Sequence, residues 1–404
     1  METATLTIAL PSISLSSTDD NKQFFSSLSG WRDPLYLGGD GYDNDLLDWI
    51  NIEELSNDYQ LDLSDVGIAI LDSGLDPYVW QYMIDHTYGT NLDITYIRVK
   101  WVSWRFWDPY DYIIEDSPYG DTQAQDEDGH GTWVTYTTWQ VLRGVMSSSP
   151  SIYLFDIDFP AYPNRRAEVI GALKWIYNHQ EGTDIEIVSM SYGFSSSNNG
   201  EHTWISKLTN DYPCVCFAAS GNDDKNEIAY PARYSEVIAI GAHYDDHDGY
   251  LTDNQEFSSA DVGHRVTSSI SGKYFPHPSW GSNYGENLDF AAPGFDVEIM
   301  NPEDAPTYYQ AGVVDGTSFA CPISAAVGVI VQHAAAPADD VGIDKAQLYT
   351  ILEKSAELYQ YPRGEYEVPR PRIRQDHLKS YCLELGHGGI DAYDAYLRAR
   401  GIDY

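Results

Sequence analysis

The amino-acid sequence predicts an α/β fold of three layers, in which a mostly parallel central sheet is covered by helices on both faces. Five short runs of apolar and β-branched residues recur along the chain, as expected of strands that are buried on both faces. They lie at residues 66–71, 152–155, 185–190, 215–219 and 237–240. Between the second and third runs, apolar residues recur at helical spacing, at Val169, Ile170, Leu173, Ile176 and Tyr177. In sheets of this kind, functional groups gather at the carboxyl ends of the strands.

The chain of 404 residues is long enough for one large domain. Residues 1–45 are polar and contain Gly and Asp clusters such as GGDGYDND, so we expect an N-terminal extension outside the core, in the manner of a short pro-segment. Apolar residues at helical spacing then open a domain that we place at 46–404, at Leu46, Leu47, Ile50 and Leu55.

The stretch 91–126 is aromatic and acidic, and it breaks the alternation of strands and helices. We therefore interpret it as an insertion in the domain. Its residues Trp101, Trp104 and Trp107 suit either a wall that faces a substrate or ordinary core packing, and core packing is the commoner role of tryptophan at such spacing.

The charge of the chain is strongly negative, with 62 acidic against 23 basic residues and a net charge of −39. Nucleic acid and anionic membrane surfaces would repel such a protein, so we expect neither as a partner. Self-repulsion is screened at molar salt, where the Debye length falls to roughly 3 Å. The composition therefore favours a protein adapted to high salt, and the alternative is an acidic protein of an ordinary organism.

The N-terminal sequence METATLTIALPSISLSS has no basic region and no twin arginine, so it predicts an intracellular or non-classically exported protein. The longest apolar run, 323–336, contains Gln332 and His333 and is too short for a membrane span. A buried helix is the better interpretation of that run.

The stretch DGTSFACP, residues 315–322, leads into this apolar run and places Ser318 at the start of a predicted helix. Unpaired N–H groups at a helix N-terminus favour developing negative charge, but a serine also needs a histidine as base and a carboxylate that orients the histidine. Asp72 in VGIAILDSGLD and His130 in DEDGHGTWV offer these groups. The three stretches, in this order, resemble the signature boxes of the subtilisin-like serine proteases, the subtilases.

The resemblance implies a subtilisin-like fold and a serine endopeptidase in which Asp72, His130 and Ser318 form a catalytic triad and an acyl-enzyme is the intermediate. The stretch AASGNDD, followed by YPARYSEVIAIGA, implies that Asn222 donates to the oxyanion together with the Ser318 backbone N–H. The segment GHGGIDAYDAYL resembles the end of subtilase domains, so the likeness runs from about Trp49 to the C-terminus.

The stretch IVSMSYGF resembles the strand that pairs with the substrate backbone in this family. The residues implied to contact substrate are Ser191, Tyr192, Gly193, Ala219, Ser220, Gly221 and Ala229. Small residues predict a roomy apolar pocket, although Glu227 nearby would instead favour basic side chains. The chain departs from the family pattern at Trp133, Asp315, Phe319 and Ile323, and none of these changes removes a proton-transfer group.

No cofactor is needed for this chemistry, and the expected partner is a protein or peptide substrate of a monomeric enzyme. Many relatives bind calcium, but the stretch YDDHDGYLTDNQE has only an incomplete calcium-loop pattern at Asp246, Asp248 and Gly249, so solvated acidic residues are the simpler interpretation. The four cysteines, Cys214, Cys216, Cys321 and Cys382, form no CxxC pair, and we expect no disulfide framework. Alternatives to a general protease are a catalytically weak peptide-binding protein and a processing protease of narrow specificity.

Overall fold

The computed structural model of the chain describes most residues from position 50 onward. The described residues are 50–87, 92–101, 112–115, 126, 128–157, 165–244, 264–267, 280–295, 297–301, 310–335, 342–356 and 381–402. The expected N-terminal extension, residues 1–45, lies outside them, as do Leu46 and Leu47.

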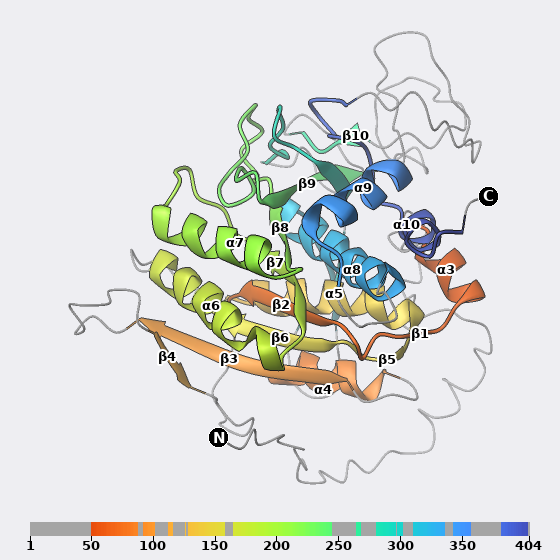
Figure 1. Cartoon of the computed structure of the whole chain (residues 1–404), viewed down its shortest axis with the longest axis horizontal. Helices are drawn as coiled ribbons and strands as arrows, with labels where there is room; N and C mark the ends of the chain where they lie inside the picture. Colours follow the sequence, from red (N-terminus) through yellow and green to blue (C-terminus); the bar gives the residue numbers. More distant parts are fainter. Residues whose placement is uncertain are drawn as a thin grey trace.

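A large, mostly parallel sheet forms the centre of the molecule (Figure 1). Among the described residues it has nine strands, in the order β10-β9-β8-β7-β2-β6-β3-β4, with β11 beside β9. Their bounds are β2 Gly67–Asp72, β3 Asp93–Trp101, β4 Tyr112–Glu115, β6 Ser151–Asp156, β7 Ile185–Met190, β8 Val215–Ala219, β9 Val237–Tyr244, β10 His264–Arg265 and β11 Phe290–Pro293. Only β4 and β10 pair antiparallel in the described sheet, so the predicted parallel α/β fold is confirmed.

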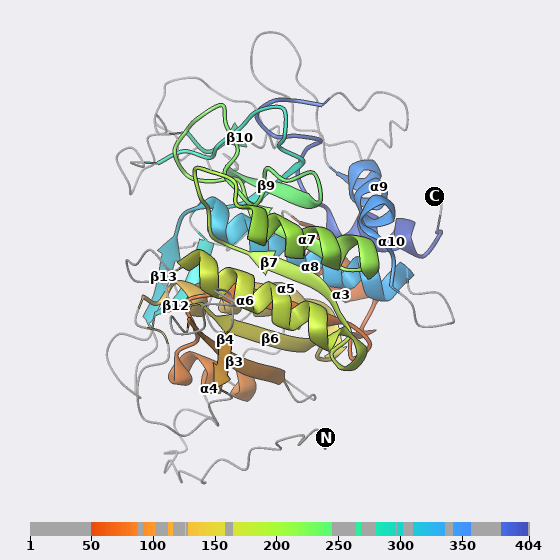
Figure 2. The ribbon, with the colours of Figure 1, turned by 60° about the vertical axis from the view of Figure 1, so that its left-hand side comes forward.

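Helices cover both faces of this sheet, and Figure 2 shows α6 and α7 side by side in front of it. The helices are α3 Ile52–Asp58, α4 Pro77–Asp85, α5 His130–Val145, α6 Arg165–His179, α7 Asn199–Asp211, α8 Thr317–Ala335, α9 Lys345–Ser355 and α10 Ala392–Ala399. Smaller elements complete the described chain, at β1 Leu61–Asp62, β5 Met146–Ser148, η2 Gln180–Gly182, β12 Val297–Asn301 and β13 Gln310–Val314.

The core divides into two layers because successive side chains of a strand point to opposite faces. In β2, Ile68 and Ile70 join the cluster that contains α5 and α8, whereas Ala69 and Leu71 join the cluster that contains α6 and α7. The strand is therefore apolar up to Leu71, as the sequence predicted for a strand covered on both sides, and only Asp72 at its end is charged.

Two parts of the chain differ from expectation. Residues 93–101 do not interrupt the alternation, because they form β3, which pairs in parallel with β6 and extends the central sheet. The first described helix begins at Ile52 and buries Ile52 and Leu55, so Ile50, which was predicted on the same helical face, lies before the helix in a turn. The side chains of Trp101, Trp104 and Trp107 lie outside the described part of the structure.

Helix α8 is the most enclosed helix of the fold. By length and composition it is apolar enough to cross a membrane, but 83% of its most apolar window is buried inside the domain. It packs between the sheet, through β7, β8 and β9, and helices α5 and α10. The sequence interpretation as a buried helix is thus correct, and the helix begins at Thr317, so Ser318 lies in its first turn as predicted.

Gly328 lets α8 approach the sheet closely. A Cβ at this position would lie 2.9 Å from Phe217 and 3.1 Å from Ile187, and both of these side chains are fully buried. We therefore expect Gly328→Val to lower the free energy of unfolding by about 1–3 kcal/mol, measured by urea denaturation. Gly182→Ala, where the added methyl meets open space, is the control and should stay within about 0.5 kcal/mol of wild type. Equal stability of the two variants would contradict this account of the packing.

Candidate active site

The carboxyl end of β2 places Asp72 against the first residue of α5. Asp72 is fully buried, and its Oδ1 accepts hydrogen bonds from His130 Nδ1 at 2.7 Å and from the Ser73 backbone N–H at 2.8 Å. An ionised carboxylate can only accept, so Nδ1 carries the hydrogen and Nε2 of the neutral ring is left as a base.

The environment of His130 acts on its proton affinity in two directions. Burial of the ring disfavours the charged form, but the Asp72 charge and hydrogen bond outweigh this effect, with smaller contributions from Asp128 and Asp126. The net result is a raised pKa for His130. Asp72 therefore both orients the imidazole and stabilises the imidazolium that forms when the ring takes a proton.

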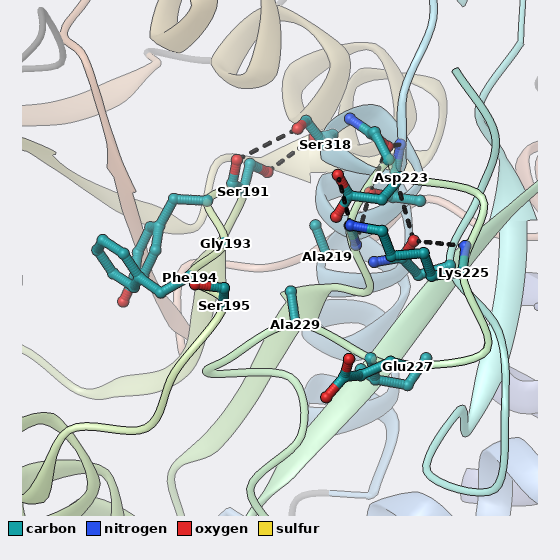
Figure 3. A pocket seen from close by; sticks show the side chains of 16 residues that line it. Ser191, Gly193, Phe194, Ser195, Ala219, Asp223, Lys225, Glu227, Ala229 and Ser318 are labelled. Atoms are coloured by element: carbon teal, nitrogen blue, oxygen red, sulfur yellow. Dashed lines mark hydrogen bonds and ion pairs between the residues drawn. The ribbon is translucent and has the colours of Figure 1, made fainter.

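Ser318 lies in the first turn of α8, one residue before Phe319, which contacts His130. The ring of Phe319 is 5.7 Å from the ring of His130, which brings the start of α8 to the start of α5. Ser318 Oγ donates to the Ser191 carbonyl at 3.2 Å, and Ser191 Oγ donates to the Ser318 carbonyl at 2.7 Å (Figure 3). Three stretches that are far apart in sequence thus meet at one edge of the sheet.

Asn222 follows β8 and is held by the residue before Ser318. Its Oδ1 accepts from the Thr317 backbone N–H at 3.0 Å and from the Thr317 hydroxyl at 2.8 Å. Because a backbone N–H can only donate, the amide oxygen must face Thr317, and Nδ2 is the end left to donate elsewhere. Asn222 and Ser318 line the same cavity.

This cavity has a volume of about 300 Å³ and contains most of the predicted substrate-contacting residues. Those that line it are Ser191, Tyr192, Gly193, Ala219, Gly221 and Ala229, with Phe194 and Ile228 as further apolar walls. Ser220 differs from the prediction. It is not among the residues that line the cavity; it is fully buried, and its hydroxyl donates to the Asn283 carbonyl at 3.2 Å.

The cavity changes character along its length. In Figure 3, Ser318 lies at one end and Glu227 at the other, with Ala219 and Ala229 between them. Glu227 forms an ion pair of 2.7 Å with Arg233, so its charge is already partly balanced. The middle of the cavity is therefore lined by small apolar side chains, while its far end is charged.

Asp126 was not identified from the sequence as a site residue. This buried carboxylate accepts hydrogen bonds from the Ser73 hydroxyl at 2.9 Å and from the Gly129 N–H at 2.8 Å. It also accepts from Thr132, through the backbone N–H at 2.7 Å and through the hydroxyl. It thus ties the residue after Asp72 to the N-terminus of the helix that carries His130. The only signal in the sequence is an acidic residue shortly before a helix, which is a common arrangement.

Thr317 and Asn283 were also missed. Thr317 stands inside the DGTSFACP stretch, so its place beside the nucleophile was visible, but its bonds to Asn222 were not. Asn283 lines the cavity, but nothing in the sequence around it indicates this role. The residues that its side chain bonds to are 58 to 63 positions away in the sequence.

The described residues contain no group of three or more His, Cys, Asp or Glu side chains that could hold a metal ion. Asp246, Asp248 and Gly249, the incomplete calcium-loop pattern, lie outside the described part of the chain. The four cysteines are free thiols, and Cys214, Cys216 and Cys321 are buried.

Comparison with known proteins gives a consistent result. The model of the subtilase family matches residues 64–377. Subtilisin BL of Lederbergia lenta is 28% identical over 218 residues, which are 53% of this chain and 66% of that protein. M-protease of Shouchella clausii is 27% identical over 53% of this chain and 47% of its own length. The chain thus spans between about half and two thirds of the length of these curated relatives.

A solved structure described as proteases from Pseudoalteromonas arctica PAMC 21717 superposes with a TM-score of 0.56 at 18% identity, over 89% of this chain and 98% of that one. At this identity the likeness concerns the fold alone, and it agrees with the parallel sheet and its two helical layers. Since the family model also covers most of the chain, this protein belongs to the subtilase family.

Proposed function

We propose that the chain is a serine endopeptidase that hydrolyses peptide bonds through Ser318, His130 and Asp72. The observation that carries this proposal is the 2.7 Å contact of His130 Nδ1 with the buried Asp72 carboxylate, beside the helix turn that bears Ser318. Membership of a family of serine peptidases supports it.

In the first step, the Ser318 hydroxyl leaves its acceptor on Ser191 and gives its proton to His130 Nε2, while Oγ attacks the peptide carbonyl carbon. The carbonyl oxygen becomes an oxyanion, which accepts from Asn222 Nδ2 and from the Ser318 backbone N–H. The imidazolium is stabilised by Asp72. Collapse of the tetrahedral intermediate breaks the C–N bond, and the amine leaves with the proton from His130.

In the second step, water replaces the amine. His130 takes a proton from the water as it attacks the acyl carbon, and the proton returns to Ser318 as the acid is released. The side chain before the scissile bond would occupy the cavity between Ala219 and Ala229, and Glu227 and Arg233 at its far end would meet only a long side chain.

We also propose that the protein is adapted to high salt. The support is the charge of the chain, 62 acidic against 23 basic residues, because like charges at this density repel one another in the compact state unless ions screen them.

Replacement of the nucleophile tests the proposed reaction directly. Ser318→Ala should abolish both peptide hydrolysis and labelling by a fluorophosphonate probe, because both reactions need the Ser318 hydroxyl as nucleophile. Ser324→Ala is the matched control on the same helix, since this buried hydroxyl bonds only within α8, to the Ala320 carbonyl at 3.0 Å. It should keep full labelling. An unlabelled wild-type protein that still binds peptides would support the alternative of a peptide-binding protein.

The pH dependence follows from the raised pKa of His130. Only the neutral imidazole acts as a base, so kcat/KM should fall with decreasing pH through a midpoint above the ordinary value of 6.5. Asp72→Asn should move the His130 titration, followed by NMR, to lower pH, and it should reduce kcat by about 10⁴-fold. Glu236→Gln, which changes the partner of His202 instead, is the control. An unchanged His130 midpoint in Asp72→Asn would refute the assigned cause.

Salt adaptation is tested by thermal unfolding at low and at molar KCl. The midpoint should rise with KCl, because screening at a Debye length of roughly 3 Å weakens the repulsion among carboxylates. Sucrose of equal osmolality serves as the control, since it is excluded from protein surfaces but does not screen charge. No rise in KCl, or an equal rise in sucrose, would remove the salt proposal without affecting the proposed catalysis.

A further inference from the structure

The loop that carries Asn222 lies along a second segment of the chain. The Asn283 N–H donates to the Gly221 carbonyl at 2.8 Å, the Asp224 N–H to the Gly281 carbonyl at 2.8 Å, and the Tyr284 N–H to the Lys225 carbonyl at 2.9 Å. The loop is therefore supported along its whole length by main-chain hydrogen bonds to this segment, residues 281–284.

The Asn283 side chain adds a second set of bonds to the same loop. It is 1% exposed, its Nδ2 donates to the Ser220 carbonyl at 3.1 Å, and its Oδ1 accepts from the N–H groups of Asp223 at 3.0 Å and Lys225 at 3.2 Å. These contacts lie on both sides of Asn222 in the sequence. One buried amide thus fixes the main chain before and after the proposed oxyanion donor.

The shape of the loop is fitted to this side chain. Gly221 has a φ of +103°, which L side chains rarely adopt, and a Cβ at this position would overlap Asn283 Nδ2. Arg265 also links the loop to the supporting segment, because its Nη1 donates to Asp224 Oδ1 in the loop at 2.6 Å and to the Ser282 carbonyl in the segment at 2.7 Å. Loop and supporting segment are therefore joined at several points.

We propose that Asn283 is a positioning residue that sets the direction in which Asn222 donates to the oxyanion. Thr317 holds the Asn222 side chain from α8, and Asn283 holds the main chain before and after Asn222. Transition-state stabilisation by a fixed donor depends on its placement before the reaction, and a displacement of about 1 Å can cost about 10²-fold in rate. This inference rests on the proposed function.

A double-mutant cycle tests it, with a tetrapeptide p-nitroanilide as substrate. Asn222→Ala alone should lower kcat by about 10²- to 10³-fold. Asn283→Ala alone should lower kcat by roughly 10- to 100-fold with KM changed by less than about twofold. When Asn283→Ala is added to Asn222→Ala, kcat should fall by less than about a further twofold, because the donor that Asn283 positions is already absent.

Ser282→Ala is the matched control for a loss of buried hydrogen bonding in the same segment. Ser282 is fully buried, and its hydroxyl accepts from the Ala242 N–H of β9 at 2.9 Å and donates to the Asn283 carbonyl at 3.2 Å. Its loss leaves the three hydrogen bonds of the Asn283 side chain to the loop of Asn222 in place. This variant should lower the thermal midpoint while kcat stays at the wild-type value. Asn283→Ser, a smaller change, gives the same cycle if Asn283→Ala does not fold.

Two results would overturn the inference while hydrolysis by the wild type stands. The first is a loss of kcat from Asn283→Ala that is as large in the Asn222→Ala background as in the wild type. The second is a rise in KM at unchanged kcat, which would make Asn283 a ground-state substrate contact. A wild-type protein that neither cleaves the substrate nor takes up the fluorophosphonate would refute the proposed function, and this inference with it.

Discussion

The hydrogen bond between the Asp72 carboxylate and the His130 imidazole depends on placing a charge inside the protein, and much of the surrounding structure follows from this need. Asp72 ends β2, which lies between β7 and β6, so the carboxylate is removed from water on every side. Its Oδ2 has no hydrogen-bond partner within the described structure. The two hydrogen bonds of the carboxylate, from the Ser73 N–H and from His130 Nδ1, both reach Oδ1, and the second holds the imidazole in the tautomer that carries its hydrogen on Nδ1.

A common pattern runs through the site, because each proposed functional group is held by a second polar group. Asp126 joins the residue after Asp72 to the helix of His130, and Thr317 fixes the amide of Asn222. These supporting groups are buried and accept or donate several bonds, so they have little freedom to move. The positions of the proposed reacting groups are therefore set mainly by hydrogen bonds and packing in the protein interior, and to a smaller extent by the surface loops.

Much of this arrangement could be predicted from the sequence. The strand at 185–190 and the strand at 215–219 have the bounds that apolar runs predicted, because a strand covered on both faces must be apolar throughout. The order of the Asp72, His130 and Ser318 stretches led to the family, which the comparison confirmed.

What could not be predicted depends on contacts between distant parts of the chain. Residues 93–101 mix polar and aromatic residues, so their membership of the sheet follows only from pairing with β6. Asn283 and Asp126 are ordinary polar residues in sequence, and their roles come from partners that the fold brings to them. Ser220 was assigned to the cavity by its neighbours in sequence, but it is fully buried and its hydroxyl bonds to the distant Asn283 carbonyl.

The enclosure of α8 has a consequence for motion in this protein. Its first turn carries Ser318, while the rest of the helix lies between the sheet and α5. Segments with the most buried contacts open only when the whole domain unfolds, whereas surface loops open at far lower free energy. Amide hydrogens in the middle of α8 should accordingly exchange with solvent only when the whole domain unfolds. The residue proposed as nucleophile is thus attached to the segment with the highest free energy of opening.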